Sequence, residues 1–178
     1  FTESDWRRLK DSDNVHVAVA LAEIGRDELA SQVLIHEAKI GDPRDFAPLS
    51  RLARELGLPQ TQLYMAYNAP VGASPDPASR YPAPKWAPVG GWQVDPALAF
   101  AHTLQESAFR GKAVSPADAR GLMQITPITV REFAPRLGLS ASDVNIFDPA
   151  TNLAFGQQNL KMLRDSAATR GDLPKIMA

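Results

Sequence analysis

A glutamate at position 106 is the residue whose surroundings best suit acid–base chemistry. The apolar spacing predicts a helix from Pro96 to about Arg110, and Glu106 falls in its last turn, at the edge of the apolar face. Its neighbours on that edge are Ala99 and His102. Half-burial against apolar neighbours raises the pKa of a carboxyl group, because desolvation disfavours the charged form. A carboxyl that keeps its proton at neutral pH is a candidate general acid. Most helix glutamates are solvated surface residues, and that interpretation stays open from the helix alone.

Three short sequence blocks, one of which contains Glu106, favour a catalytic role for this glutamate over a surface one. Q-E-S-x-F occupies residues 105–109, G-L-M-Q occupies 121–124, and D-P-x-x-N-L-x-x-G-x-x-x-L occupies 148–160. None of these blocks is specific alone, but in this order and spacing the sequence resembles the catalytic domain of the soluble lytic murein transglycosylases, family 1. That domain has a lysozyme-like fold. The resemblance covers about 98–163 and extends weakly to the N-terminal part, since relatives carry an α-superhelical region there.

The resemblance implies one reaction and one catalytic residue. The family cleaves the β-1,4 bond between N-acetylmuramic acid and N-acetylglucosamine (MurNAc and GlcNAc) in peptidoglycan and leaves a 1,6-anhydro ring. The glutamate matched by Glu106 first protonates the leaving oxygen and then accepts the proton of the sugar's own 6-hydroxyl. Most glycosidases need a second carboxylate. An intramolecular nucleophile does not, because it is already held beside the anomeric carbon.

Five further residues are expected at the substrate site. By matching position, Ser115 borders the cleft and Gln124 contacts sugar, while Gly121 allows close approach of the main chain to a ligand. Two more candidates are Thr126, where the family often has an apolar residue, and Ser107, for which a hydrogen bond at the helix end is an equal alternative. Asp118 also departs from the family pattern, which usually has a small residue there.

Composition excludes several other classes of protein. The 178 residues carry a net charge of −1 and no cysteine, so neither disulfides nor thiolate chemistry is possible. The three histidines lack metal-ligand spacing, and we expect no cofactor or metal. No apolar run approaches the roughly 20 residues of a membrane-spanning helix. Near-neutral charge argues against a nucleic-acid partner. The resemblance implies glycan strands as the partner and a periplasmic or cell-envelope location, although no signal peptide is visible. The oligomeric state stays open.

The elements that position these residues are predicted to be all helical. Residues 1–68 read as short helix pairs of an α-superhelix, and residues 94–178 as a lysozyme-like helical domain. Between them, residues 69–93 hold six of the 15 prolines and are interpreted as a linker or strap. Proline after Asp95, Thr126 and Asp148 marks three helix starts in the second part.

The resemblance also predicts a cleft motif near the end of the sequence. The family has an A-Y-N-A-G motif one helix after the D-P-x-x-N block, and its tyrosine lines the cleft. The sequence ends at Ala178, where that motif should begin, and the similar residues 66–69 stand before Glu106. The domain is therefore expected to be truncated at its C-terminus, and the chain as given to be inactive or weakly active.

Three other functions remain open. A helical module could bind glycan or protein without cutting it. A hydrolase related to goose-type lysozyme would share the single-glutamate arrangement but add water. A helical scaffold with no glycan role is a third, weaker interpretation, because it leaves the three ordered blocks unexplained.

Overall fold

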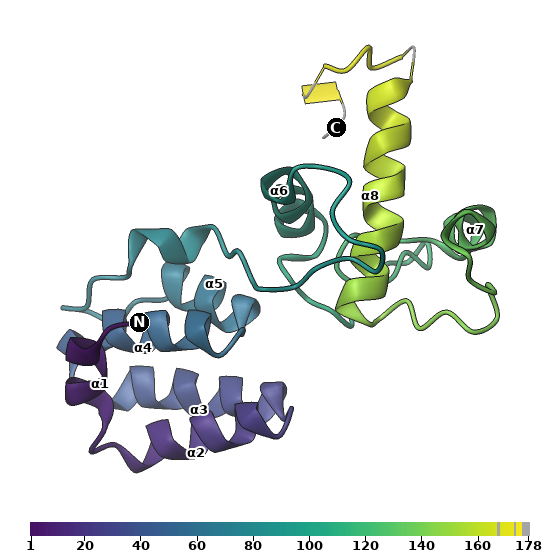
Figure 1. Ribbon diagram of the computed structural model, residues 1–178. Coiled ribbons are helices and arrows are strands. Elements are labelled where there is room, and N and C mark those ends of the chain that lie inside the picture. The colour runs from purple at the N-terminus through teal and green to yellow at the C-terminus, as the bar shows by residue number, and fades with distance from the viewer. Residues whose placement is uncertain (167, 173, 176–178) are drawn as a thin grey trace. The chain divides into compact units, whose positions relative to one another are not determined.

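Helices make up the regular structure of the chain. The computed structural model describes residues 1–166, 168–172 and 174–175, and over these ranges it holds eight α-helices, three short 3-10 helices and no strand. The all-α prediction is confirmed. The chain divides into two compact units, Phe1–Pro84 and Lys85–Ala178, which are described separately (Figure 1). In the described part, no helix is both long and apolar enough to cross a membrane.

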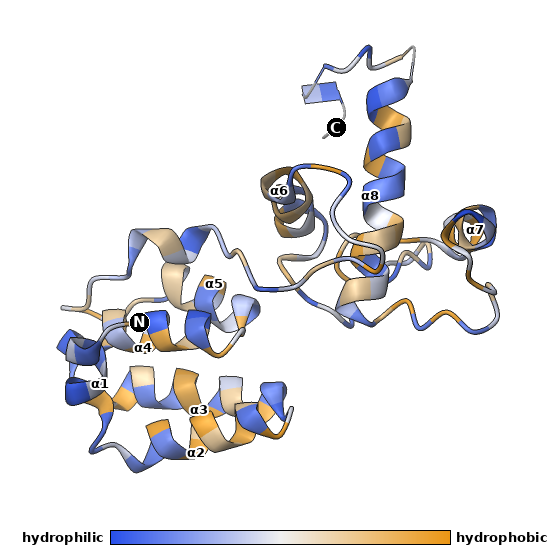
Figure 2. Cartoon of the chain, in the orientation of Figure 1, coloured by the Kyte–Doolittle hydropathy of each residue, from blue (hydrophilic) through white to orange (hydrophobic). Residues whose placement is uncertain are grey.

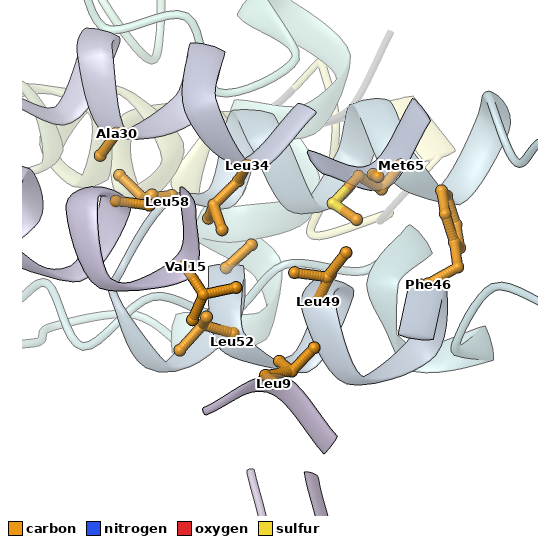
Figure 3. Close-up of a cluster of buried hydrophobic side chains, with 12 residues drawn as sticks. Leu9, Val15, Ala30, Leu34, Phe46, Leu49, Leu52, Leu58 and Met65 are labelled. Atoms are coloured by element: carbon orange, nitrogen blue, oxygen red, sulfur yellow. The ribbon is translucent and has the colours of Figure 1, made fainter. Parts of the chain in front are cut away.

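The first unit is a stack of helix pairs. Successive helices α2 to α5 lie side by side, and α1 packs on α4 (Figure 1). Leucines, alanines and single Val, Phe and Met side chains from all five helices form its buried core (Figure 3). The helices are α1 (Glu3–Leu9), α2 (Asp13–Glu23), α3 (Asp27–Ile40), α4 (Phe46–Glu55) and α5 (Pro59–Tyr67).

Two local details of this unit differ from the sequence expectation. The seven-residue α1 was not predicted, yet it has a clear start signal: the Thr2 side chain and the Asp5 side chain cap each other's backbone N–H groups. Asp42-Pro43 is a helix-start signal that predicts a helix from Pro43, but the chain instead forms a 3-10 turn, Pro43–Asp45, before α4. The Asp42 side chain accepts from the Arg44 N–H and holds that tighter turn.

In the described part of the second unit, three α-helices begin as predicted. α6 (Pro96–Ser107), α7 (Pro127–Phe133) and α8 (Pro149–Asp165) each start at a proline, and the preceding Asp95, Thr126 or Asp148 side chain accepts a hydrogen bond from a first-turn N–H group. A 3-10 turn, Ala134–Leu137, continues α7. In Figure 2, hydrophobic and hydrophilic patches alternate along α8, as expected for a helix with one buried side.

Helix α8 organises the core of this unit, because both α6 and α7 pack against it. The core is built from residues of all three helices and of the segments that connect them, namely Ala99, Leu122, Met123, Ile125, Phe133, Ala134, Ile146, Leu153, Phe155 and Leu160. The loop that carries the G-L-M-Q block is thus anchored by its own apolar side chains.

The proline-rich residues 69–93 contribute to both units. A 3-10 turn, Pro77–Arg80, packs on α5 in the first unit. Trp86 and Trp92 pack on the core of the second unit. The buried side chain of Gln157 accepts from the Gln93 N–H at 2.9 Å and donates to the Gly91 carbonyl at 2.9 Å. These two bonds tie residues 91–93 to α8.

Candidate active site

The helix that carries Glu106 ends in an unusual turn. The sequence predicted helix to about Arg110, but α6 stops at Ser107, and both Ala108 (φ 50°) and Phe109 (φ 62°) are left-handed. Two such residues in succession are uncommon without glycine and mark a conformation that the surroundings enforce. The turn buries the Phe109 ring, whose centroid lies 6.5 Å from that of Trp86 and 6.4 Å from that of Phe100. Burial of Phe109 therefore fixes the last turn of α6.

Glu106 lies on that last turn with a histidine as its neighbour. Its side chain is 33% exposed, and its Oε1 atom lies 3.9 Å from Nε2 of His102, one helical turn earlier. The His102 side chain is only 11% exposed. Burial lowers the pKa of His102, and the Glu106 charge opposes this to a smaller extent. The glutamate is thus partly accessible, as a residue that meets substrate must be, and its inner side faces a buried imidazole rather than apolar groups alone.

The loop after α6 is held by its own backbone. The Gly121 N–H donates to the Ala113 carbonyl at 2.8 Å, and Arg120 and Ile125 exchange two bonds of 3.0 Å. The Ser115 Oγ atom accepts from the Ala119 N–H at 3.1 Å. These bonds, which include two isolated β-bridges, make the loop compact. The loop follows directly after α6, the helix that carries Glu106.

Gly121 is required by a close approach that the sequence did not reveal. Its φ is +74°, and an added Cβ would overlap Nδ2 of Asn152 and lie 3.1 Å from the Ile146 carbonyl oxygen. The fully buried Asn152 carboxamide donates to the Arg120 and Ile146 carbonyls and accepts from the Met123 N–H, at 2.8–3.0 Å. The expectation for Gly121 was approach to a ligand, whereas here the neighbour is Asn152. Asn152 stands in the third sequence block, but its role depends on a contact across 29 to 32 positions.

The other expected binding residues have different surroundings. Gln124 is left-handed (φ 50°), and its Nε2 atom donates to the Gly121 carbonyl at 2.9 Å. Ser107 is buried and donates to the Thr103 carbonyl within α6. The Thr126 hydroxyl caps α7 by accepting from the Thr129 N–H. Ser107 and Thr126 therefore serve their helices, whereas Ser115 and Gln124 belong to the loop.

Asp118 is already paired. Its two carboxylate oxygens accept from Nε and Nη2 of Arg120 at 2.7 and 2.9 Å. This guanidinium holds the pKa of Asp118 below its usual range. Among the residues that the structure describes, no cluster of three or more His, Asp or Glu side chains could hold a metal ion. What the site offers chemically is thus the partly accessible Glu106 carboxyl group beside a hydrogen-bonded loop whose Asp118 is paired with Arg120.

Comparisons with known proteins identify the domain in the second half of the chain. Residues 88–175 match the family model of the transglycosylase SLT domain, so this part of the chain is an SLT domain. The 70 kDa soluble lytic transglycosylase SLT70 from Escherichia coli superposes with a TM-score of 0.65 at 22% identity, covering 88% of this chain and 26% of that one. An inactive mutant of lytic transglycosylase Slt from Pseudomonas aeruginosa superposes with a TM-score of 0.65 at 23% identity, covering 97% and 28%.

A third solved structure is a complex of the 70-kDa soluble lytic transglycosylase with bulgecin A, with a TM-score of 0.66 and 21% identity over 88% of this chain and 26% of that one. The expected lysozyme-like, all-α fold is confirmed. The chain spans roughly a quarter of the length of each of these proteins.

Proposed function

We propose that this chain is the part of a peptidoglycan lytic transglycosylase that carries the catalytic acid, and that Glu106 is that acid. The observation that supports the proposal is the position of Glu106: partly exposed, on the enforced last turn of α6, within an SLT domain. The solved structures that share the fold are named as lytic transglycosylases. The substrate is the β-1,4 bond between MurNAc and GlcNAc in glycan strands, and the protein acts in the cell envelope or periplasm.

The reaction needs one carboxyl group used twice. Glu106 donates its proton to the glycosidic oxygen as the bond to the anomeric carbon breaks. The resulting carboxylate then accepts the proton of the 6-hydroxyl, whose oxygen bonds to the anomeric carbon and closes the 1,6-anhydro ring. No water enters, and the proton count of Glu106 is restored. The intramolecular nucleophile supplies the proximity for which other glycosidases use a second carboxylate.

Asp118 supports this single-acid mechanism because it is engaged elsewhere. Its two oxygens accept from Arg120, and this guanidinium lowers the pKa of Asp118, which is the opposite of the change that suits a general acid. The binding residues of the proposal are the loop residues Ser115, Gln124 and Gly121, of which Gly121 acts by letting the loop pack closely against Asn152. Ser107 and Thr126 are retained as expected contacts whose hydroxyls also bind their own helices.

Product mass tests the proposal. The protein that carries this chain is incubated with purified peptidoglycan, and the soluble fragments are analysed by mass spectrometry. A transglycosylase yields ends lighter by one water than reducing ends. Reducing ends would show a hydrolase of the goose-lysozyme kind, and retention of glycan without new ends would show a binding module; either result contradicts the proposed reaction.

A further inference from the structure

One ring nitrogen of His102, the histidine one turn before Glu106, has no hydrogen-bond partner among the described residues. This atom, Nδ1, is buried. Its other ring nitrogen, Nε2, faces Oε1 of Glu106 at 3.9 Å. Buried polar atoms nearly always have partners, so an unpartnered one beside a proposed catalytic group requires an explanation.

The surroundings select one protonation state of this imidazole. A proton on Nδ1 would be a buried donor without an acceptor, and it would turn the Nε2 lone pair toward a carboxylate oxygen. A proton on Nε2 instead directs an N–H group at the Glu106 carboxyl and leaves Nδ1 as a buried acceptor without a donor, rather than as a buried donor without an acceptor. The doubly protonated ring is opposed by burial, which lowers the pKa of His102 by more than the Glu106 charge raises it. The favoured state is therefore a neutral ring with its single proton on Nε2, directed at Glu106.

We propose that His102 is a positioning residue for Glu106: its neutral imidazole donates Nε2–H to Oε1, so that the acidic proton is carried by Oε2. This inference rests on the proposed function. The separation of 3.9 Å exceeds a hydrogen bond, and a small rotation of the exposed glutamate side chain or one bridging water closes it. Two side chains four residues apart on a helix are placed for such a contact.

The bond serves both halves of the reaction without His102 changing its charge. In the first half, a donor on Oε1 leaves Oε2 as the oxygen that holds the proton and delivers it to the glycosidic oxygen. In the second half, the same donor stabilises the carboxylate while Oε2 takes the proton of the 6-hydroxyl. The proton leaves from Oε2 and returns to Oε2, and the imidazole proton stays on Nε2.

The charged side chains on α6, at its two ends and on α8 have the following partners, and Nε of Arg110, just after α6, donates to the Ser107 carbonyl. Glu106 is the only charged residue within α6 itself. On α8, which packs against α6, Lys161 donates to the Gln93 side chain and Arg164 is paired with Asp165. At the start of α6, the Asp95 side chain caps the Ala97 N–H.

Nuclear magnetic resonance tests the protonation state without any need for activity. The imidazole ¹⁵N shifts of His102, assigned with His102→Gln, are followed between pH 5 and 8 in the protein that carries this chain. We expect the neutral Nε2–H form at pH 7, and we expect Glu106→Gln to lower the apparent pKa of His102 further, since the opposing charge is lost. A proton on Nδ1, or a charged ring at pH 7, would overturn the proposal.

Enzyme kinetics test the effect of the His102 N–H group on catalysis by Glu106. His102→Gln keeps an N–H group near the position of Nε2, whereas His102→Leu keeps the volume and removes the donor; His102→Met replaces it if the leucine variant fails to fold. We expect kcat to fall about tenfold or more in the apolar variant, with KM little changed, and to recover largely in the glutamine variant. Wild-type kcat and an unshifted pH profile in the apolar variant, or no recovery with glutamine, would overturn the proposal. Absence of cleavage by the wild-type protein would instead overturn the proposed function, and the resonance test would still decide the state of His102.

Discussion

Nε2 of His102 lies 3.9 Å from Oε1 of Glu106, across one turn of α6. The two side chains differ threefold in exposure, with the glutamate at 33% and the histidine at 11%. A carboxyl group in this position can exchange a proton with a ligand in front of it, while the group behind it is shielded from solvent. Glu106 is therefore accessible to a ligand, and its neighbour His102 is buried. This suits a carboxyl group that acts first as an acid and then as a base.

Replacement of Gly121 by alanine should destabilise the second unit strongly. The alanine Cβ would overlap the Asn152 amide and would also hold a left-handed φ of +74°. Strain and overpacking together should cost about 2–4 kcal/mol of unfolding free energy. Urea unfolding measures this cost.

Gly138 provides the matched control for that substitution. It has a similar φ of +69°, but an added Cβ would meet nothing within 4 Å. Gly138→Ala should therefore cost only the backbone strain, about 1–2 kcal/mol. Equal losses at the two glycines would show that the contact with Asn152 is unimportant.

Gly156 and Met123 should be energetically coupled. A Cβ at Gly156 would overlap the Met123 Sδ atom, and both residues are buried between α8 and the G-L-M-Q loop. Gly156→Ala should cost about 1–3 kcal/mol in the wild-type background and much less in a Met123→Ala background, where the sulfur is gone. A double-mutant cycle should give a coupling free energy of about 1 kcal/mol or more. Strict additivity would contradict the packing described here.

The first unit should lose stability in acid through Asp5. This carboxylate is 6% exposed and accepts from Arg51 at 2.6 and 3.0 Å, and the Arg51 guanidinium holds its pKa well below the usual range. A depressed folded-state pKa stabilises the fold above the unfolded pKa of about 4, and this contribution disappears as the pH falls below it. Asp5→Asn should therefore be less stable by about 3 kcal/mol at pH 7 and should have a flatter stability profile between pH 5 and 2.

The Asp42–Arg44 pair is the control for this titration. Arg44 lowers the pKa of Asp42 to about 2, but the pair is exposed to solvent. Screening by water should make the pH dependence of an Asp42→Asn variant close to that of the wild type. Amide signals of α1 and α4 followed during urea unfolding at each pH report the first unit directly. A steep acid profile that persists in Asp5→Asn would show that other groups cause the loss.

Local signals in the sequence predicted most of the helices. Proline after a capping side chain marked the starts of α6, α7 and α8, because the missing N–H and the side-chain acceptor act within one turn. The end of α6 was missed, since nothing in Ser107-Ala108-Phe109 breaks a helix locally. The left-handed turn exists because Phe109 packs against Trp86 and Phe100, a contact made by the folded unit.

The candidate site residues came from the sequence, and their roles stay predictions. Glu106 and the loop residues were singled out by three ordered blocks that resemble a known family. The role of Asn152 depends on hydrogen bonds to residues some 30 positions away, and the partnerless Nδ1 of His102 depends on burial in the assembled fold. Neither property has a local signature. The interpretation of the proline-rich residues 69–93 as a linker or strap stays a prediction.

The most direct test of the central claim compares the wild-type protein with Glu106→Gln by mass analysis of fragments released from purified peptidoglycan. Glutamine preserves the shape of the side chain but can neither donate the acid proton nor accept the 6-hydroxyl proton. We expect 1,6-anhydro ends from the wild type and none from the variant, with binding to peptidoglycan retained in both. Anhydro ends released by the variant at the wild-type rate would contradict it.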